Sequence, residues 1–301
     1  SPTPRAWGKA KVAGCAVTLS GVGNMGGAMA QRLAQLGWAP AIHDLDRAKV
    51  EALLPFGALA PEDIAQAASK SIATILCVVD AAQVRDVLFG TDGLARHLPA
   101  GHVVMLCPTI APHDVESIAT QLLAQGVWTL DAPMSGGPAR ALDGSMSLMV
   151  AGPGAARTLC RPLLEALSSK VFDISDRPGD GARTKLVNNL LAGINLVGAA
   201  EAMALADRLG LDASRTLDVI AQSSGQSWIG TDRMRRAVAG DLAPRAHMTL
   251  LAKDTRLALD AAQAAGFAGP LGEAASAVFA QAVRAGLAGM DDAALLEFLK
   301  R

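Results

Sequence analysis

The chain has 301 residues, of which 51% are hydrophobic and 18% are charged, and its formal net charge is −1. This length allows one large or two ordinary domains, and the composition is that of a globular rather than a disordered chain. The near-neutral charge gives no electrostatic case for a nucleic acid or an anionic membrane as a partner.

The first predicted elements are a strand, a glycine turn, a helix and a second strand. Residues 1–11 are polar, contain two prolines and are expected to form a flexible tail without a signal peptide. An apolar strand over Cys15–Leu19 leads into the glycine turn, and a helix is expected over Ala28–Leu36. A short strand over Ala39–Ile42 then ends at His43-Asp44.

Strands and helices keep alternating up to residue 178. The later strands are expected at 57–59, 71–79, 103–106, 127–130, 147–150 and 171–172, and the later helices at 46–54, 61–68, 81–88, 112–124 and 154–167. This alternation predicts a Rossmann-type, doubly wound and mostly parallel sheet of the α/β class over residues 12–178.

Strand signals stop after the loop Pro178-Gly179-Asp180-Gly181, so residues 179–301 are expected to form an all-helical C-terminal domain. The expected helices are 181–209, 214–221, 228–238, 250–265, 271–285 and 292–299. Gly193 and Gly198 in the long helix indicate a tight helix–helix contact, either within the chain or between subunits. Charges and glycines interrupt every apolar stretch, so no membrane-spanning segment is expected.

The glycine turn has the pattern G-x-G-x-x-G, formed by Gly21, Val22, Gly23, Asn24, Met25 and Gly26. The first glycine allows a tight turn, the second lets the backbone approach a pyrophosphate, and the third lets helix and strand pack closely. The following helix N-terminus offers N–H groups to phosphates. The strand, helix and acid around the turn favour a dinucleotide site over a simple turn.

Asp44 lies eighteen residues after Gly26, where a carboxylate can accept both ribose hydroxyls of NAD and repel a 2′-phosphate. Asp46 can cap the next helix, which leaves Asp44 for the ribose. Arg47 could instead hold the phosphate of NADP. The expected cofactor is NAD, with NADP possible.

The segment Asp131-Ala132-Pro133-Met134-Ser135-Gly136-Gly137-Pro138 follows a predicted strand. Backbone N–H groups around Gly136 and Gly137 can form a concavity that holds an anion, and Ser135 adds a hydroxyl. A plain β-turn without a ligand explains the same residues.

Lys185, Asn188 and Asn189 share one face near the start of the long apolar helix. Such side chains are costly on a buried helix unless they meet polar partners, which favours a site over a solvated first turn. Trp228 is either a pocket wall or a packed residue between helices, and Lys253-Asp254 is either part of a site or a surface pair.

Metal and disulfide chemistry find no support in the sequence. The four cysteines contain no C-x-x-C pair and the five histidines show no ligand spacing, so no metal is expected. Small buried thiols fit a reduced, cytoplasmic setting.

Across nearly its whole length the chain resembles the β-hydroxyacid dehydrogenase family, which includes 3-hydroxyisobutyrate dehydrogenases and tartronate semialdehyde reductases. Four blocks carry the resemblance in order: 21–26, 131–137 with Gly144 behind it, 181–189, and Lys253-Asp254. The run Val78-Val79-Asp80-Ala81-Ala82-Gln83 and the pair Ser227-Trp228 look most like the L-threonate dehydrogenase branch.

The resemblance implies roles for single residues. It implies Lys185 as general acid/base and Asn189 as its substrate-orienting partner, with Ser135, Gly136, Gly137, Asn188 and Trp228 at the substrate. It also implies that Val79, Thr109 and Lys253 lie at the cofactor. Two positions depart from the family: Pro108 replaces the usual Ser before Thr109, and Asn189 matches the hydroxyisobutyrate type rather than the threonate branch.

The resulting hypothesis is an NAD-dependent oxidoreductase for a small 3-hydroxy acid, such as 3-hydroxyisobutyrate, L-threonate or glycerate. Burial and the positive nicotinamide ring should lower the pKa of Lys185 from about 10.4 toward the range useful for proton transfer. The alternatives are an NADPH-dependent semialdehyde or imine reductase and a non-catalytic dinucleotide-binding scaffold. By analogy with the family, a homodimer or homotetramer is expected.

Overall fold

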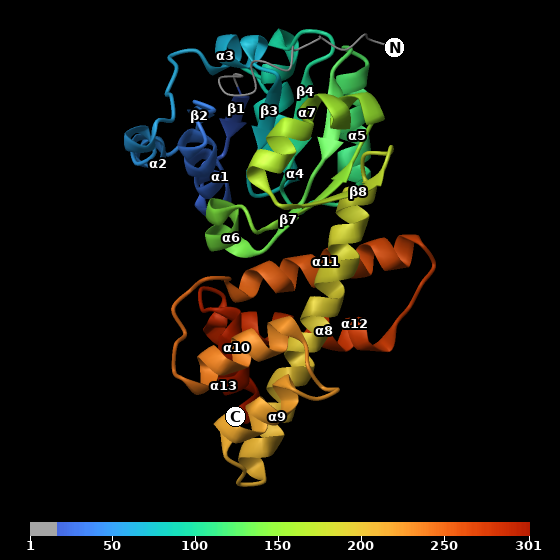
Figure 1. Cartoon of the computed structure of the whole chain (residues 1–301). Coiled ribbons are helices and arrows are strands. Elements are labelled where there is room, and N and C mark those ends of the chain that lie inside the picture. Colours follow the sequence, from blue (N-terminus) through green and yellow to red (C-terminus); the bar gives the residue numbers. More distant parts are fainter. Residues whose placement is uncertain (1–16) are drawn as a thin grey trace. The chain divides into compact units, whose positions relative to one another are not determined.

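The computed structural model describes residues 17–301. The expected tail at 1–11 and the first two residues of the predicted strand Cys15–Leu19 lie outside the described residues. Contacts divide the chain into two compact units, Ser1–Lys185 and Leu186–Arg301, and the division falls inside one long helix, α8 (Asp180–Arg208) (Figure 1).

The first unit is built on one eight-stranded sheet. Its strands are β1 (Val17–Ser20), β2 (Ala41–His43), β3 (Ala73–Leu76), β4 (Val103–Leu106), β5 (Trp128–Asp131), β6 (Met134–Ser135), β7 (Ser147–Ala151) and β8 (Lys170–Ser175). The strand order is β2-β1-β3-β4-β5-β7-β6, with β8 paired to β7. The strands β1 to β5 are all parallel, and β7 runs antiparallel to β5 and β6. The expected Rossmann-type, mostly parallel sheet is confirmed.

Helices cover both faces of this sheet. They are α1 (Asn24–Gln35), α2 (Arg47–Glu51), α3 (Ile64–Lys70), α4 (Ala81–Phe89), α5 (Pro112–Leu123), α6 (Gly137–Asp143) and α7 (Gly154–Leu167). One core cluster joins alternate strand residues such as Ile75 to Leu33 of α1 and Leu163 of α7, and a second joins Leu76 to Ile118 of α5. Successive strand residues point to opposite faces, so the uninterrupted apolar run in β3 supplies both layers.

Several predicted boundaries are wrong, for local reasons. The helix α1 begins at Asn24 rather than Ala28, because Gly23 is its N-cap and the last glycines of the turn are already helical. The helix α3 begins after Asp63, whose side chain accepts the N–H of Gln66, rather than at Pro61. The expected strand at 57–59 is a single bridge between Ala41 and Leu59. The structure adds β6 and α6 to the predicted elements.

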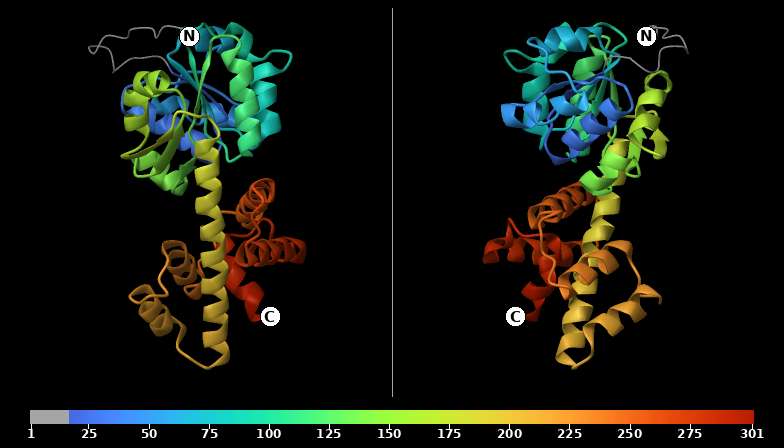
Figure 2. Two further views of the ribbon diagram at one scale, coloured as in Figure 1. Left: turned by 90° about the vertical axis from the view of Figure 1, so that its right-hand side faces the viewer. Right: turned by 60° about the vertical axis from the view of Figure 1, so that its left-hand side comes forward.

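The second unit is all-helical, as expected, and holds the rest of α8 together with α9 (Ala213–Ala221), α10 (Trp228–Val238), α11 (Met248–Ala264), α12 (Pro270–Ala282) and α13 (Leu295–Lys300) (Figure 2). Residues 186–301 contain one isolated β-bridge, between His247 and Asp291. The expected helix at 271–285 ends earlier, because Gly286 interrupts the following turn with a φ of +93°. The core joins side chains of α8 to the other helices, for example Leu196 to Phe279 of α12.

The helix α8 is apolar on nearly all sides. Gly193 meets the core, where an added Cβ would lie 2.7 Å from Thr255 Cγ2, whereas a Cβ at Gly198 would meet nothing within 4 Å. Among the described residues, α8 is the one helix long and apolar enough to cross a membrane, with 44% of the relevant window buried. The buried core helix of a soluble protein has the same length and composition, so this finding is weak evidence for a membrane span.

Candidate active site

The glycine turn after β1 has a geometry that only glycine permits at two positions. Gly21 has a φ of +90°, and an added Cβ would lie 2.7 Å from the carbonyl oxygen of Cys77. A Cβ at Gly26 would lie 1.9 Å from the carbonyl oxygen of Gly21. The turn is therefore tight, and α1 packs directly against it.

The middle glycine leaves room beside the start of α1. Gly23 is the N-cap of this twelve-residue helix, and an added Cβ there would meet nothing within 4 Å. The first N–H groups of a helix lack partners within the helix and carry a partial positive charge. The open space and these donors fit a pyrophosphate group.

Asp44, at the end of β2, lies against the same turn. Its Oδ2 accepts the N–H of Val22 at 2.8 Å, and its Oδ1 accepts the N–H of Asp46 at 2.9 Å. Asp46 caps α2, as predicted, by accepting the N–H of Ala48. The carboxylate of Asp44 is thus fixed beside the phosphate-binding turn, where it fits the ribose of a dinucleotide.

Two residues close to Asp44 in the chain, Leu45 and Arg47, have exposed side chains. The Nε of Arg47 donates to Glu51 at 3.0 Å, and both side chains are exposed. Leu45 is 95% exposed, and sequence analysis did not select it. In the sequence, Leu45 is a single apolar residue directly after an acid and outside any periodic pattern, and no other feature of the sequence marks it.

The parallel strands bring other predicted residues to the same edge of the sheet. Val79 follows the end of β3, is exposed, and donates its N–H to Gln83 Oε1. Thr109 follows the end of β4 and is half-buried. Because β1 to β4 run parallel, the glycine turn, Asp44, Val79 and Thr109 all lie beyond the carboxyl ends of their strands, where open α/β sheets bind ligands.

The segment Ser135-Gly136-Gly137 forms a strand-to-helix junction rather than the plain β-turn that sequence analysis left open. Ser135 ends β6, Gly136 caps α6 with a φ of +135°, and Gly137 has a φ of +76°. All three are half-buried. Two successive glycines with positive φ turn the backbone sharply, which is the conformation that a concave set of N–H groups requires.

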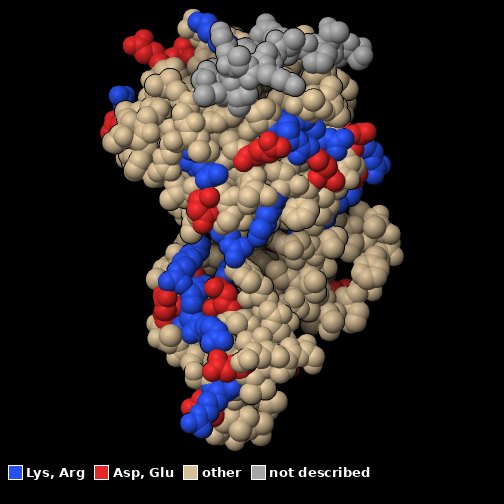
Figure 3. All heavy atoms as spheres, viewed as in Figure 1, with Lys and Arg blue, Asp and Glu red and all other residues tan. Residues whose placement is uncertain are grey.

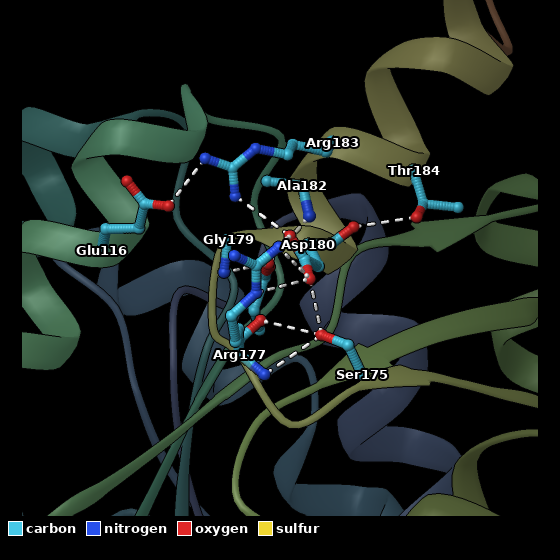
Figure 4. A network of polar contacts seen from close by, with 9 residues as sticks. Glu116, Ser175, Arg177, Gly179, Asp180, Ala182, Arg183 and Thr184 are labelled. Carbon is cyan, nitrogen blue, oxygen red and sulfur yellow. Dashed lines mark hydrogen bonds and ion pairs between the residues drawn. The ribbon is translucent and has the colours of Figure 1, made fainter.

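The start of α8 is attached to the end of β5. Asp131 Oδ2 accepts the N–H of Gly179 at 2.9 Å and that of Ala182 at 2.8 Å, and Figure 4 shows this turn with its surrounding ion pairs. Lys185 lies three residues further along α8 and is 7% exposed. A buried lysine at the edge of a ligand-binding sheet is a candidate for proton transfer.

Burial governs the titratable groups of the first unit. It raises the pKa of Asp131 to about 6, with Asp180 adding to the rise and the N–H groups of Ala182, Gly179 and Gly181 opposing it. Burial also raises the pKa of Cys77 to about 12 and that of Cys107 well above its usual value. These thiols are poor nucleophiles at neutral pH. The described residues contain no group of three or more His, Cys, Asp or Glu side chains that could hold a metal ion.

In the second unit the structure brings four polar side chains together. Asn188 Nδ2 donates to Asn189 Oδ1 at 3.0 Å, and Asn189 Nδ2 donates to Asp254 Oδ2. Lys253 Nζ lies 3.9 Å from Asp254 Oδ1. Asn189 and Asp254 are buried, so this part of the cluster lies inside the second unit.

Trp228 lies on α10 beside an arginine of the same helix. It is the first residue of α10, follows the N-cap Ser227, and is exposed. The guanidinium of Arg233 lies 5.9 Å from the centre of its ring, at cation–π distance. These contacts favour neither of the two interpretations of Trp228.

Sequence analysis did not identify the structural roles of Asp131 and Asp254. Both carboxylates are buried and accept hydrogen bonds from groups far away in the chain. The one local signal was an acid that ends an apolar strand or begins an apolar helical face.

Comparisons with known proteins agree with this architecture. Residues 16–175 match the model of the NAD binding domain of 6-phosphogluconate dehydrogenase, and residues 179–299 match that of the NAD-binding domain of NADP-dependent 3-hydroxyisobutyrate dehydrogenase. The L-threonate dehydrogenase of Escherichia coli K12 is 38% identical over 93% of both chains. The NAD-dependent L-serine dehydrogenase of Pseudomonas aeruginosa is 32% identical over 91% of this chain and 94% of its own.

Solved structures give the same result. The crystal structure of 3-hydroxyisobutyrate dehydrogenase from Salmonella typhimurium has a TM-score of 0.86 at 38% identity, over 94% of this chain and 99% of that chain. The glycine turn on a Rossmann sheet, together with the dehydrogenase relatives, identifies the chain as an NAD(P)-dependent oxidoreductase. With the matches above, the chain belongs to the β-hydroxyacid dehydrogenase family.

Proposed function

We propose that the protein oxidises a small hydroxy acid of the L-threonate type with NAD, and that Lys185 is the general acid/base. Relatives named L-threonate dehydrogenase support the substrate class. The observation that carries the catalytic assignment is the burial of Lys185 on α8, one turn beyond the attachment of this helix to β5. A non-catalytic scaffold is excluded by the dehydrogenase relatives.

When bound, the nicotinamide cofactor accepts a hydride from the carbinol carbon of the substrate. The Lys185 amine takes the hydroxyl proton as the carbonyl forms, and in the reverse direction its ammonium returns that proton. Because Lys185 is buried, little water competes for this proton. The balance is one hydroxy acid and NAD⁺ giving one oxo acid, NADH and a proton.

Other residues bind and orient the substrate in this proposal. Ser135 and the N–H groups of Gly136 and Gly137 hold the substrate carboxylate, while Asn188 and Trp228 line the substrate site. Asn189 has one N–H donated to Asp254, which fixes its amide orientation, and we assign its second N–H to the substrate hydroxyl.

Cofactor binding is assigned to residues at the edge of the sheet. The backbone of residues 21–26 and the N-terminus of α1 bind the pyrophosphate, and Asp44 binds the adenosine ribose. Val79 and Thr109 contact the cofactor further along this edge, and Lys253 is assigned to cofactor binding as well. Arg47 forms an exposed pair of little energetic worth, so it can turn to a 2′-phosphate at small cost, which keeps NADP possible.

Two further proposals concern the cellular location of the protein and its self-association. Cys77, Cys107 and Cys160 are free thiols, and the relatives are bacterial dehydrogenases, both of which fit the cytoplasm. Self-association into a homodimer or homotetramer is supported by apolar side chains exposed on α8, such as Leu191 and Leu205.

The test is turnover of L-threonate, D-glycerate, 3-hydroxyisobutyrate and 3-hydroxypropionate, each with NAD and with NADP. We expect the highest kcat/KM for L-threonate with NAD. In Lys185→Ala we expect kcat to fall by a factor of about 10² to 10⁴ while NAD still binds, because general acid–base catalysis contributes that much. Near-wild-type turnover in Lys185→Ala would refute the catalytic assignment, and a flat response to all four acids would refute the substrate class.

A further inference from the structure

The carboxylate of Asp131 is buried at the end of β5 without a cationic partner among its described hydrogen bonds. Its side chain is 1% exposed, and burial of a carboxylate is costly unless hydrogen bonds replace its hydration. The bonds come from the start of α8, where Gly179 and Ala182 donate their N–H groups to Oδ2. Helix N-termini need such acceptors, because their first N–H groups have no partner within the helix.

The cap of α8 therefore comes from a strand rather than from the residue before the helix. Gly179 directly precedes α8 and has no side chain that could cap it. The approach is close: a Cβ at Gly181 would lie 2.8 Å from the carbonyl oxygens of both Asp131 and Met149. The first turn of α8 is pressed against β5 and β7, and only glycine fits at position 181.

The other contacts of this turn are on its solvent side (Figure 4). Arg177 and Arg183 pair with Asp180, and Arg183 also pairs with Glu116 at 2.7 Å. Glu116 and the two arginine side chains are about half exposed or more, so water competes for these pairs, whereas Asp180 is 15% exposed. Asp131 provides the buried contact of the turn, so it is the stronger anchor.

Lys185 lies three residues beyond Ala182, about 4.5 Å further along the axis of the same helix. A helix backbone is stiff over one turn, so the placement of Ala182 determines the placement of Lys185. We propose that Asp131 is a positioning residue for Lys185: by fixing the first turn of α8 to the end of β5, it sets the place of the Lys185 amine at the edge of the sheet. This inference rests on the proposed function of Lys185.

The first experiment compares Asp131→Ala and Asp131→Asn with the wild-type protein, using the best substrate of the four acids and NAD. We expect kcat to fall roughly 100-fold in Asp131→Ala, because a misplacement of about 1 Å costs that much, with NAD affinity unchanged within about 3-fold. Asp131→Asn should recover most of the loss, since its amide oxygen can accept the same N–H groups. Wild-type kcat in both variants would overturn the inference.

A double-mutant cycle separates positioning of Lys185 from general damage. In a Lys185→Ala background, Asp131→Ala should lower the residual turnover by less than about 3-fold, because its effect passes through the missing amine. An equal loss in both backgrounds contradicts the inference. The matched control is Leu122→Ala in the core of α5, which should lower the Tm while leaving kcat unchanged.

If Asp131→Ala does not fold, Gly181→Ala tests the same inference. It leaves the carboxylate intact but displaces the first turn of α8, so kcat should fall while NAD affinity is kept. Normal kcat in Gly181→Ala would reject the inference. If Lys185→Ala itself retains turnover, the proposed function fails too; if it loses turnover while the Asp131 variants do not, the positioning role alone fails.

Discussion

Asp44 uses both carboxylate oxygens on backbone N–H groups, one in the glycine turn and one at the start of α2. Each oxygen still has acceptor capacity for a ribose hydroxyl, since an ionised carboxylate offers about four lone-pair sites. In the proposed cofactor site, the Asp44 side chain thus joins the ribose position to the phosphate-binding turn. Its charge also disfavours a 2′-phosphate at the same place.

For Asp44→Ala we expect NAD affinity to fall roughly 10- to 100-fold, because a hydrogen bond to a charged group contributes about 1.5–3 kcal/mol. Asp44→Asn should keep more of that affinity but lose the repulsion of the 2′-phosphate, so its NAD/NADP ratio of kcat/KM should drop. Binding titrations and steady-state kinetics with both cofactors measure the two effects. An unchanged cofactor ratio in both variants would exclude Asp44 from the ribose site.

Single residues were predictable where their chemistry is local. Gly26 packs against the backbone of Gly21 and Asp46 caps at Ala48, both within a few positions, while Gly21 adopts a positive φ that glycine takes readily. Asp131 and Asp254 act through partners 51 and 65 positions away, which the sequence pattern does not bring together. Their roles became visible only when the fold placed a strand end and a helix face beside them.

At the scale of elements, α10 is joined to the segment before α13 by buried charges. Arg236 Nη1 lies 2.9 Å from Asp291 Oδ1, and Arg233 Nε donates to Asp292 at 2.6 Å. Burial acts to raise the pKa of Asp291, but N–H groups of Arg245, Ala293 and Ala246 and the charge of Arg236 lower it below its usual value.

On the face shown in Figure 3, acidic and basic atoms lie interspersed rather than in patches of one sign.

For Arg236→Met we expect a loss of about 3–5 kcal/mol in the free energy of unfolding, because removal of one partner leaves a buried carboxylate uncompensated. The matched control is Arg235→Met on the same helix, whose half-exposed pair with Asp218 should contribute at most about 1 kcal/mol. Urea unfolding at pH 7 compares the two variants. Equal losses would show that the buried network does not stabilise the second unit.

The outer face of α8 carries a second element-scale prediction. Leu191, Gly198, Ala202 and Leu205 lie on one side of the helix and are exposed, and Gly198 has open space beside it. Glycine inside a helix costs about 1 kcal/mol relative to alanine, which a close contact with a second copy would offset. Gly193 is the glycine that serves the contact within the chain.

We expect the wild-type protein to sediment at a multiple of its 30.8 kDa chain mass, and Leu205→Glu to shift it toward the monomer. Leu123→Glu, at an equally exposed leucine at the end of α5, serves as control and should leave the mass unchanged. Analytical ultracentrifugation at micromolar concentration gives the answer. A wild-type monomer would rule out this interface.

Helices and strands were predicted best where the hydrophobic periodicity and the residues that end an element indicate the same bounds. The strand β4 and the helices α7 and α10 have the expected bounds. The junction of β6 and α6 was missed, because a two-residue strand shows no alternation and its helix begins within a glycine pair. Tertiary pairing with β7 creates that strand, and pairing is not written in a local pattern.

At the scale of the whole molecule, fold class and family were accessible from the sequence. The change from alternating strands and helices to helices alone gave the order of the two parts, and four short blocks gave the family. The preferred hydroxy acid was not accessible, because the sequence pattern does not show which side chains contact the substrate.

The contact boundary between the two units runs through α8, just after Lys185 and ahead of Asn189. Lys185 and Asn189 are four positions apart on one continuous helix, which corresponds to a rise of about 6 Å along its axis. The continuous backbone of α8 therefore keeps the Lys185 amine and the Asn189 amide at a fixed spacing along the helix. Any motion of the protein that leaves α8 intact would therefore move these two side chains together, and with them the proton-transfer and substrate-binding roles that we propose for them.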